Sequence, residues 1–160
     1  MQDRLHFIAK SEGCEVEDAQ LNTILEVAGG DMRRAVTTLQ SVHALGRGVD
    51  DAAICEIVGM PPVALVDRLY EALSAKNFDT MRSIVEDVCL SGYSSQSLLS
   101  KLLPRFTETP DLTELGRARL AIRIAEAEKN MIEGADEFLQ LMTVCSLAMD
   151  CFQLAKAVNQ

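Results

Sequence analysis

The residues best suited to chemistry in this sequence are two adjacent arginines, Arg33 and Arg34, which follow Gly29, Gly30 and Asp31. An Asp after two glycines is typical of a helix N-cap, and apolar residues with helical spacing follow it. Two cations in a first turn oppose the helix dipole, at a cost of about 0.3–1 kcal/mol each, whereas an anion there is favoured. Free backbone N–H groups beside two guanidinium groups therefore suggest a phosphate-binding corner.

Helical geometry predicts that the two arginine side chains point in different directions. Arg33 lies about 100° around the helix from Met32, at the edge of the buried stripe, and Arg34 points away from that stripe. Arg33 is therefore the one that can reach a ligand held beside the helix. The alternative, that both arginines are solvated surface charges, stays open on geometry alone.

Other chemistry-bearing residues have simpler interpretations. Ser94 and Ser95 stand where a helix cap belongs, without a nearby histidine, and His6 and His43 lack a metal ligand at suitable spacing. An acidic run suggests catalytic carboxylates or a metal, but its helical spacing near Lys129 favours a solvated face. That run comprises Glu126, Glu128, Glu133, Asp136 and Glu137. Three arginines have carboxylates around them, which favours a surface or subunit-interface role over nucleic-acid binding. They are Arg117, Arg119 and Arg123.

Composition limits the function classes. The 160 residues carry a net charge of −9, which disfavours unaided binding to DNA or anionic lipid. The absence of Trp and the 4% aromatic content favour helices over strands. Five cysteines without a C-x-x-C pair indicate core thiols in a reducing compartment and no metal site. No apolar run of about 18 residues stands out, so we expect a soluble intracellular chain with no membrane partner.

Apolar periodicity predicts an all-α fold in two parts. Three short helices are expected in the first part, over residues 2–12, 17–28 and 31–45, with Gly46, Arg47 and Gly48 ending the third. A short helical turn precedes Pro61-Pro62, which we take as the domain boundary. Five helices are expected beyond it. They cover 63–75, 77–90, 94 or 95 to just before Pro110, 113–133 and 136–157.

The first part resembles a known family at the arginine pair. Gly30-Asp31-Met32-Arg33, with Ala35 and Leu39 after it, is similar to the sensor 2 motif in the lid of AAA+ ATPases. The similarity is greatest to the small subunits of replication factor C, the eukaryotic clamp loader. In that family the arginine matching Arg33 approaches the ATP γ-phosphate. Many members have Asn where Thr37 stands here.

The second part resembles the collar domain of the same family. The similarity is carried by Gly92-Tyr93-Ser94, Ile124-Ala125-Glu126-Ala127-Glu128-Lys129 and Gly134-Ala135-Asp136-Glu137-Phe138-Leu139-Gln140-Leu141. The resemblance implies a truncated three-helix AAA+ lid bundle over 1–48, a linker over 49–62 and a five-helix collar, the oligomerisation domain, over 63–160.

The resemblance also implies a function. A heteropentamer of replication factor C subunits, joined through their collars, uses ATP to load a ring-shaped sliding clamp onto primer–template DNA in the nucleus, in replication and repair. Neither a G-x-x-x-x-G-K-[ST] loop nor a Walker B strand is visible, so this chain is not expected to be an ATPase itself. We expect the nucleotide-binding domain to be missing, and ATP to bind only where that domain is present.

The last predicted helix carries two apolar stripes. One, which includes Phe138, Leu141 and Cys145, can face the other helices of its domain. The second would stay uncovered and is therefore predicted to form a subunit interface. It consists of Val144, Leu147, Cys151, Leu154 and Val158. Alternatively, the helix over 115–132 covers both stripes by packing alongside.

Two functions from other classes stay open. One is a free-standing helical adaptor that binds partner helices without nucleotide. The other is a small helical enzyme or metal protein that uses the cysteines.

Overall fold

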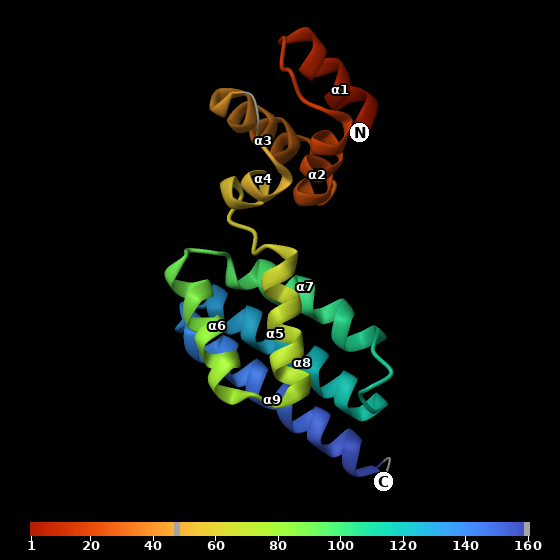
Figure 1. Ribbon diagram of the computed structural model, residues 1–160, viewed down its shortest axis with the longest axis vertical. Helices are drawn as coiled ribbons and strands as arrows, with labels where there is room; N and C mark the ends of the chain where they lie inside the picture. The colour runs from red at the N-terminus through yellow and green to blue at the C-terminus, as the bar shows by residue number, and fades with distance from the viewer. Residues whose placement is uncertain (47–48, 159–160) are drawn as a thin grey trace. The chain divides into compact units, whose positions relative to one another are not determined.

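The computed structural model describes residues 1–46 and 49–158, which form two compact units, 1–62 and 63–160. We refer to these as the N-terminal unit and the C-terminal unit. Within the described residues the regular structure is helical throughout (Figure 1). The all-α prediction is confirmed.

The described part of the N-terminal unit contains four helices, which are labelled in Figure 1. They are α1 (Gln2–Ser11), α2 (Asp18–Ala28), α3 (Met32–Leu45) and α4 (Asp51–Ile57). Each of the first three is amphipathic, and their apolar stripes meet in one core. The most deeply buried side chains there are Leu5, Leu21, Ile24, Leu39 and Ile54.

The segment predicted as a linker, 49–62, contributes to this core. Val49 is 8% exposed, Ile54 is fully buried, and α4 packs against α2 and α3. The Gln20 side-chain amide also donates a hydrogen bond to the Val49 carbonyl. Three short helices alone bury little apolar surface, so a fourth helix adds what their core lacks. Arg47 and Gly48, part of the predicted end of the third helix, lie outside the described residues; Gly46 caps α3.

Over residues 63–158 the C-terminal unit contains five helices, close to their predicted bounds. They are α5 (Val63–Ala75), α6 (Phe78–Leu90), α7 (Ser95–Glu108), α8 (Glu114–Ile132) and α9 (Glu137–Val158). Side chains of Asn77, Ser94 and Thr113 cap three of them by accepting backbone N–H groups of the first turn. The helix α7 continues through Pro104.

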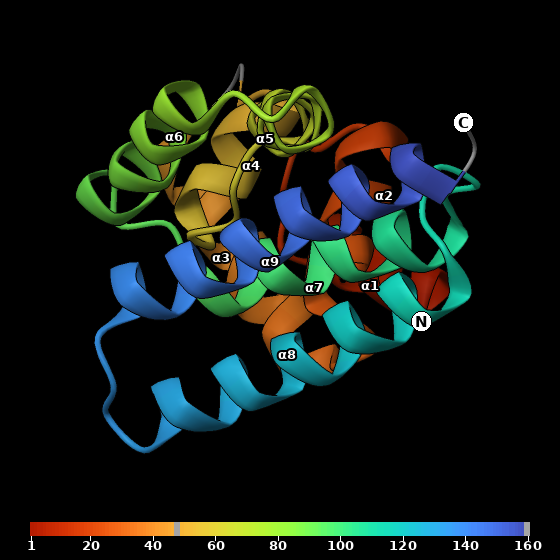
Figure 2. The same ribbon diagram turned by 90° about the horizontal axis from the view of Figure 1, so that it is seen from below.

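The helix α9 lies at the centre of this unit and packs against α5, α6 and α8. Figure 2 shows α8 and α9 running side by side, joined by a short loop. Rings of Tyr70, Phe106 and Phe152 cluster in the core with centroids 5.8–6.5 Å apart.

One described helical stretch, Glu137–Ala155, is long and apolar enough to cross a membrane by length and composition alone. This corrects the expectation that no such run exists. The same stretch packs against three helices of the C-terminal unit. This packing accounts for the apolar residues on its buried side.

Gly116 is a point of close approach between α8 and α9. A Cβ atom there would lie 3.2 Å from Thr113 Oγ1 and 3.5 Å from Cys151 Cβ. Gly116→Leu is therefore expected to lower the free energy of unfolding by about 1–3 kcal/mol, measured in urea, because the added side chain must displace Cys151. Ala118→Leu, at an exposed position of the same helix, is the control and should change it by less than about 0.5 kcal/mol. Equal losses in both variants would contradict this packing.

Candidate functional site

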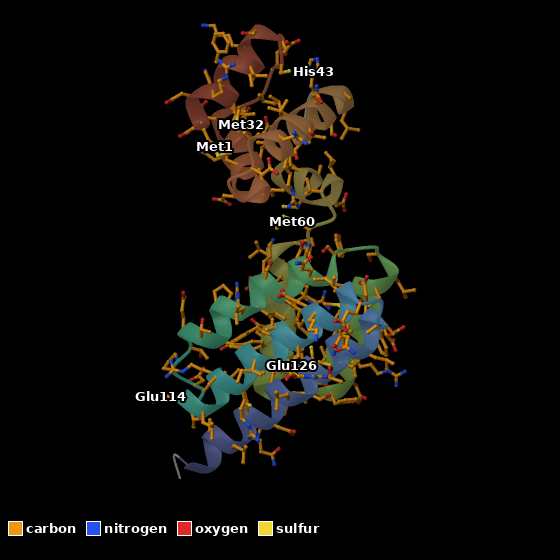
Figure 3. All side chains as sticks on the ribbon, turned by 180° about the vertical axis from the view of Figure 1, so that it is seen from behind. Met1, Met32, His43, Met60, Glu114 and Glu126 are labelled. Carbon is orange, nitrogen blue, oxygen red and sulfur yellow. The ribbon has the colours of Figure 1, made fainter. Side chains whose placement is uncertain are left out.

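The arginine pair lies in the first turn of α3, after a tight turn from α2. Gly29 and Gly30 adopt positive φ angles of 58° and 91°, which place Asp31 as the N-cap. The Asp31 carboxylate accepts the backbone N–H groups of Arg33 (2.8 Å) and Arg34 (3.3 Å). The predicted N-cap is confirmed. Figure 3 labels Met32 and His43, near the two ends of this helix.

This capping shows that one part of the predicted phosphate-binding corner is wrong. Two of the backbone N–H groups that were expected to face an anion are already bound by Asp31, whose negative charge also lies there. The guanidinium groups themselves stay available, because both arginine side chains are exposed. An anion at this corner would therefore be held by side chains rather than by the helix backbone.

Arg33 is free to make such a contact. Among the described residues, no carboxylate lies within salt-bridge distance of its guanidinium group. The Thr37 hydroxyl donates to the Arg33 carbonyl at 3.0 Å, so it is bonded within the helix.

The remaining candidate catalytic and metal-ligating residues are separated or bonded to one another. His6 Nδ1 lies 3.6 Å from Asp18, and Arg123 pairs with Glu126 at 3.1 Å. Ser95 donates its hydroxyl to Glu137. In the described ranges, no cluster of three or more histidine, cysteine and carboxylate side chains could hold a metal ion.

The Cys145 thiol is a packing group. Burial raises its pKa to about 12. Because the thiolate is the reactive form, iodoacetamide at pH 8 should leave Cys145 unlabelled in the native protein and label it after unfolding. Cys55, which is partly exposed, is the native-state control. Mass spectrometry that found both labelled at the same rate would contradict this burial.

Only part of the predicted interface stripe on α9 is exposed to solvent. Val144 and Cys151 are 0% and 3% exposed, so they cannot contact another subunit. The reason is that α8 packs along this side of α9 and covers them, as Cys151 beside Gly116 illustrates. Leu154 is 55% exposed and Leu147 is partly exposed. The Val158 side chain lies outside the described part.

The surface that α9 does expose is displaced around the helix from the predicted stripe. We define the α9 outer face as Leu139, Met142, Thr143, Ser146, Leu147, Asp150 and Leu154. All but Leu154 line a shallow depression of about 560 Å³. The apolar periodicity of the sequence did not reveal this face because Thr143, Ser146 and Asp150 lie between its apolar residues. Leu139, one of those apolar residues, is 59% exposed.

The helix α8 also carries exposed apolar side chains. Leu115 and Ile122 on α8 are 68% and 62% exposed. In the described C-terminal unit, the other large apolar side chains that are exposed away from these two helices are confined to helix ends, at Val63, Phe78 and Leu90. The surface of α8 and α9 is therefore the strongest candidate for a docking site in this unit.

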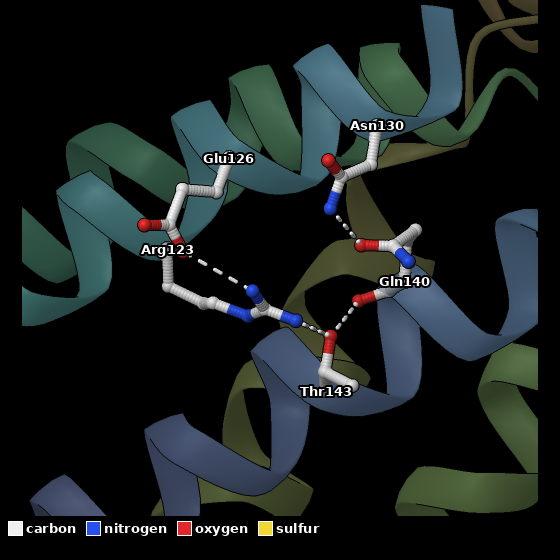
Figure 4. Close-up of polar contacts among 5 residues, drawn as sticks. All are labelled: Arg123, Glu126, Asn130, Gln140 and Thr143. Atoms are coloured by element: carbon white, nitrogen blue, oxygen red, sulfur yellow. Dashed lines mark hydrogen bonds and ion pairs between the residues drawn. The ribbon is translucent and has the colours of Figure 1, made fainter. Parts of the chain in front are cut away.

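A polar network bridges the two helices beside this surface (Figure 4). The Arg123 guanidinium donates to Thr143 at 2.8 Å and to Glu126 at 3.1 Å, and Thr143 donates to the Gln140 carbonyl at 2.7 Å. The Asn130 amide donates to the Gln140 side chain at 3.1 Å. Arg123, considered in the sequence as a surface or interface residue, is thus held at the seam between α8 and α9.

Two protein-family models match the chain in succession. Residues 3–44 match a model described as "RCF1/5-like, AAA+ ATPase lid domain". Residues 61–146, more than half of the chain, match "Replication factor C C-terminal domain". The first match contains the arginine pair, and the second contains α5 to α8 and the first part of α9.

Curated relatives agree with both matches. Replication factor C subunit 4 of Arabidopsis thaliana is 30% identical over 148 residues, covering 91% of this chain and 44% of the relative. Replication factor C subunit 4 of Homo sapiens is 31% identical over 150 residues, covering 92% and 41%. Replication factor C subunit 2 of Schizosaccharomyces pombe is 31% identical over 148 residues, covering 91% and 44%.

The chain spans less than half the length of these relatives. Relatives numbered four and two are equally similar, so identity assigns the family rather than one subunit within it. The sequence motifs at Arg33 and in the loop before α9 lie within the matched regions. This chain belongs to the replication factor C family.

Proposed function

We propose that this chain is the lid and collar portion of a DNA clamp-loader subunit. In the complete assembly, ATP drives the loading of a ring-shaped sliding clamp onto primer–template DNA in the nucleus. The chain itself performs no phosphoryl transfer in this proposal. The N-terminal unit couples nucleotide state to domain orientation, and the C-terminal unit joins the chain to related subunits.

The observation that supports the nucleotide role most strongly is the exposed Arg33 guanidinium in the lid-like unit. It has no ion-pair partner among the described residues, and Asp31 fixes the turn that presents it. A guanidinium group matches the geometry of phosphate oxygens and keeps its charge at all physiological pH values. Arg33 is proposed to contact the ATP γ-phosphate when a nucleotide-binding domain holds the rest of the ligand.

The assembly role is supported by the exposed surface of α8 and α9. Leu115, Ile122, Leu139 and Leu154 together leave apolar area in water that a neighbouring subunit would cover. Arg123 is bonded to Thr143 of the α9 outer face, and arginine is enriched in the energetically important part of interfaces. Other replication factor C subunits are the proposed partners.

The isolated chain is expected to bind ATP only weakly. The proposal gives it one nucleotide contact, and a charge-assisted hydrogen bond contributes about 1.5–3 kcal/mol. This corresponds to a Kd no tighter than about 1 mM, and no hydrolysis is expected. Isothermal titration calorimetry measures the affinity. A micromolar Kd for the purified chain would contradict this assignment.

The proposed function as a whole is tested by reconstitution. The chain is joined behind the nucleotide-binding domain of a related replication factor C small subunit and combined with the other subunits. We expect this chimera to support ATP-dependent loading of a labelled clamp onto primed DNA. A chimera that binds ATP and assembles, yet loads no clamp above the level without ATP, would contradict the proposal.

A further inference from the structure

We propose that a second copy of this chain pairs with the α9 outer face, antiparallel and about a two-fold axis, when no other subunit covers it. This self-association uses a face that the proposed function also uses. It requires neither ATP nor related subunits, so the two proposals stand or fall separately. The order of side chains along α9 and the charge of Asp150, which is unpaired among the described residues, favour this pairing.

The order of residues along the α9 outer face allows two copies of this face to pair with each other. Its residues are arranged almost symmetrically about a midpoint between Ser146 and Leu147. In an antiparallel pair centred there, Leu139 lies opposite Leu154 of the second copy, and Thr143 lies opposite Asp150. Such a contact is isologous, because each patch meets its own copy. The apolar ends, which are 59% and 55% exposed in one chain, would then cover one another.

The middle of the face favours close approach of two helices. Ser146 lies next to the midpoint, is exposed, and is small. Interaxial distances of 8–10 Å depend on the side chains at the contact, and small ones allow the shorter end of that range. Leu147 lies at the edge of the face and packs partly against the core of its own unit. The two α9 helices could therefore approach closely at the centre of the pair without a steric clash.

The charges are also complementary. Asp150 is exposed, and within the described residues it has no ion-pair partner. Arg123 is held beside Thr143 (Figure 4) and uses two of its nitrogens on Thr143 and Glu126. A guanidinium has five N–H donors, so further donors remain. Because Thr143 faces Asp150 of the second copy, the same register brings Arg123 to that carboxylate, once on each side of the axis.

The exposed face of α6 offers no comparable match. The exposed face of α6 carries Asp79, Arg82, Ser83 and Asp87, all in reach of water. Charged residues of this kind are depleted at interface cores. On the α9 outer face, by contrast, a second copy can bury apolar area and pair a charge together.

Cysteine cross-linking tests the two-fold register. Ser146→Cys should form a disulfide-linked dimer under mild oxidation, because position 146 lies beside the axis. Ser83→Cys on α6 is the exposed control and should cross-link no more than the unchanged chain. Mixed Thr143→Cys and Asp150→Cys chains should cross-link to each other at least about tenfold more than either does alone, about 1.4 kcal/mol. Equal cross-linking at positions 83 and 146 would overturn the proposal.

Sedimentation velocity tests the association itself. The unchanged chain should move from 17.5 kDa toward twice that mass as its concentration rises to 100 μM. Asp150→Arg places a cation opposite Arg123 and should weaken dimerisation at least tenfold, whereas Asp87→Arg, the same charge change on α6, should not. A chain that stays monomeric overturns this inference, and if it still binds related subunits the proposed function survives. A dimer that dissociates when a related subunit is added would support the proposal that both partners bind the same face.

Discussion

Replacing Leu147 and Leu154 together with arginine is expected to abolish co-elution of this chain with related replication factor C subunits while leaving it folded. Leu154 is 55% exposed and Leu147 partly exposed, so the free chain can keep both arginines in water. At a subunit interface the same arginines would be desolvated without a partner, which costs several kcal/mol per charge. Size-exclusion chromatography should show at least a hundredfold weaker association, about 2.7 kcal/mol.

Two control variants make this result specific. Val144→Arg puts a charge at a fully buried position three residues before Leu147 and should unfold the C-terminal unit. Ser83→Arg adds a charge to the exposed face of α6 and should leave both folding and co-elution unchanged. Circular dichroism reports folding. A double variant at 147 and 154 that unfolds, or that stays folded and still co-elutes, would contradict the interface.

Arg33→Ala is expected to reduce ATP-dependent clamp loading at least tenfold in the chimera described above, with assembly unchanged. The loss follows from removing one charge-assisted contact to the γ-phosphate, about 1.5–3 kcal/mol. Arg34→Ala should have a much smaller effect, because its side chain points away from the edge of the buried stripe. The readout is the rate at which labelled clamp appears on primed DNA.

Arg33 and Arg34 have the same charge and exposure and differ in the direction that their side chains take around the helix. Both are exposed, and both donate a backbone N–H to Asp31. Loss of general positive charge would therefore weaken both variants alike. If Arg33→Ala and Arg34→Ala were equally impaired, the assignment of Arg33 as the phosphate-reading arginine would be wrong.

Much of the fold was predictable from short-range signals. Asp31 after two glycines, Ser94 and Thr113 each cap the helix that the sequence predicts to begin there. Such caps act through bonds to the first turn of the same helix, so local sequence is enough to identify them. The helices of the C-terminal unit were predicted for the same reason, since each carries an apolar stripe at helical spacing.

Features that depend on packing between helices were less predictable. Residues 49–62 look like a linker because they contain glycines and prolines, yet Val49 and Ile54 complete the core of the N-terminal unit. On α9, two apolar stripes were visible, but only the position of α8 decides which of them stays exposed. Val144 and Cys151 are covered, and the exposed stripe contains polar residues that periodicity treats as a break.

The candidate site was predicted in part. Arg33 and its N-cap follow from sequence, and so does the use of first-turn backbone N–H groups by Asp31, which the predicted phosphate corner left out of account. Arg123 was one of three arginines with similar surroundings in the sequence. Its position at the seam of α8 and α9 appears only when Thr143 is brought beside it.

The central claim, that this chain assembles with replication factor C subunits, is tested most directly by native mass spectrometry. The tagged chain is co-expressed with related subunits, purified through its tag, and weighed as an intact complex. We predict a complex that contains this chain in a fixed ratio to related subunits, and that is lost when Leu147 and Leu154 are both arginine. Recovery of the folded chain alone, or with only unrelated helical proteins, would contradict the clamp-loader assignment and favour a free-standing adaptor.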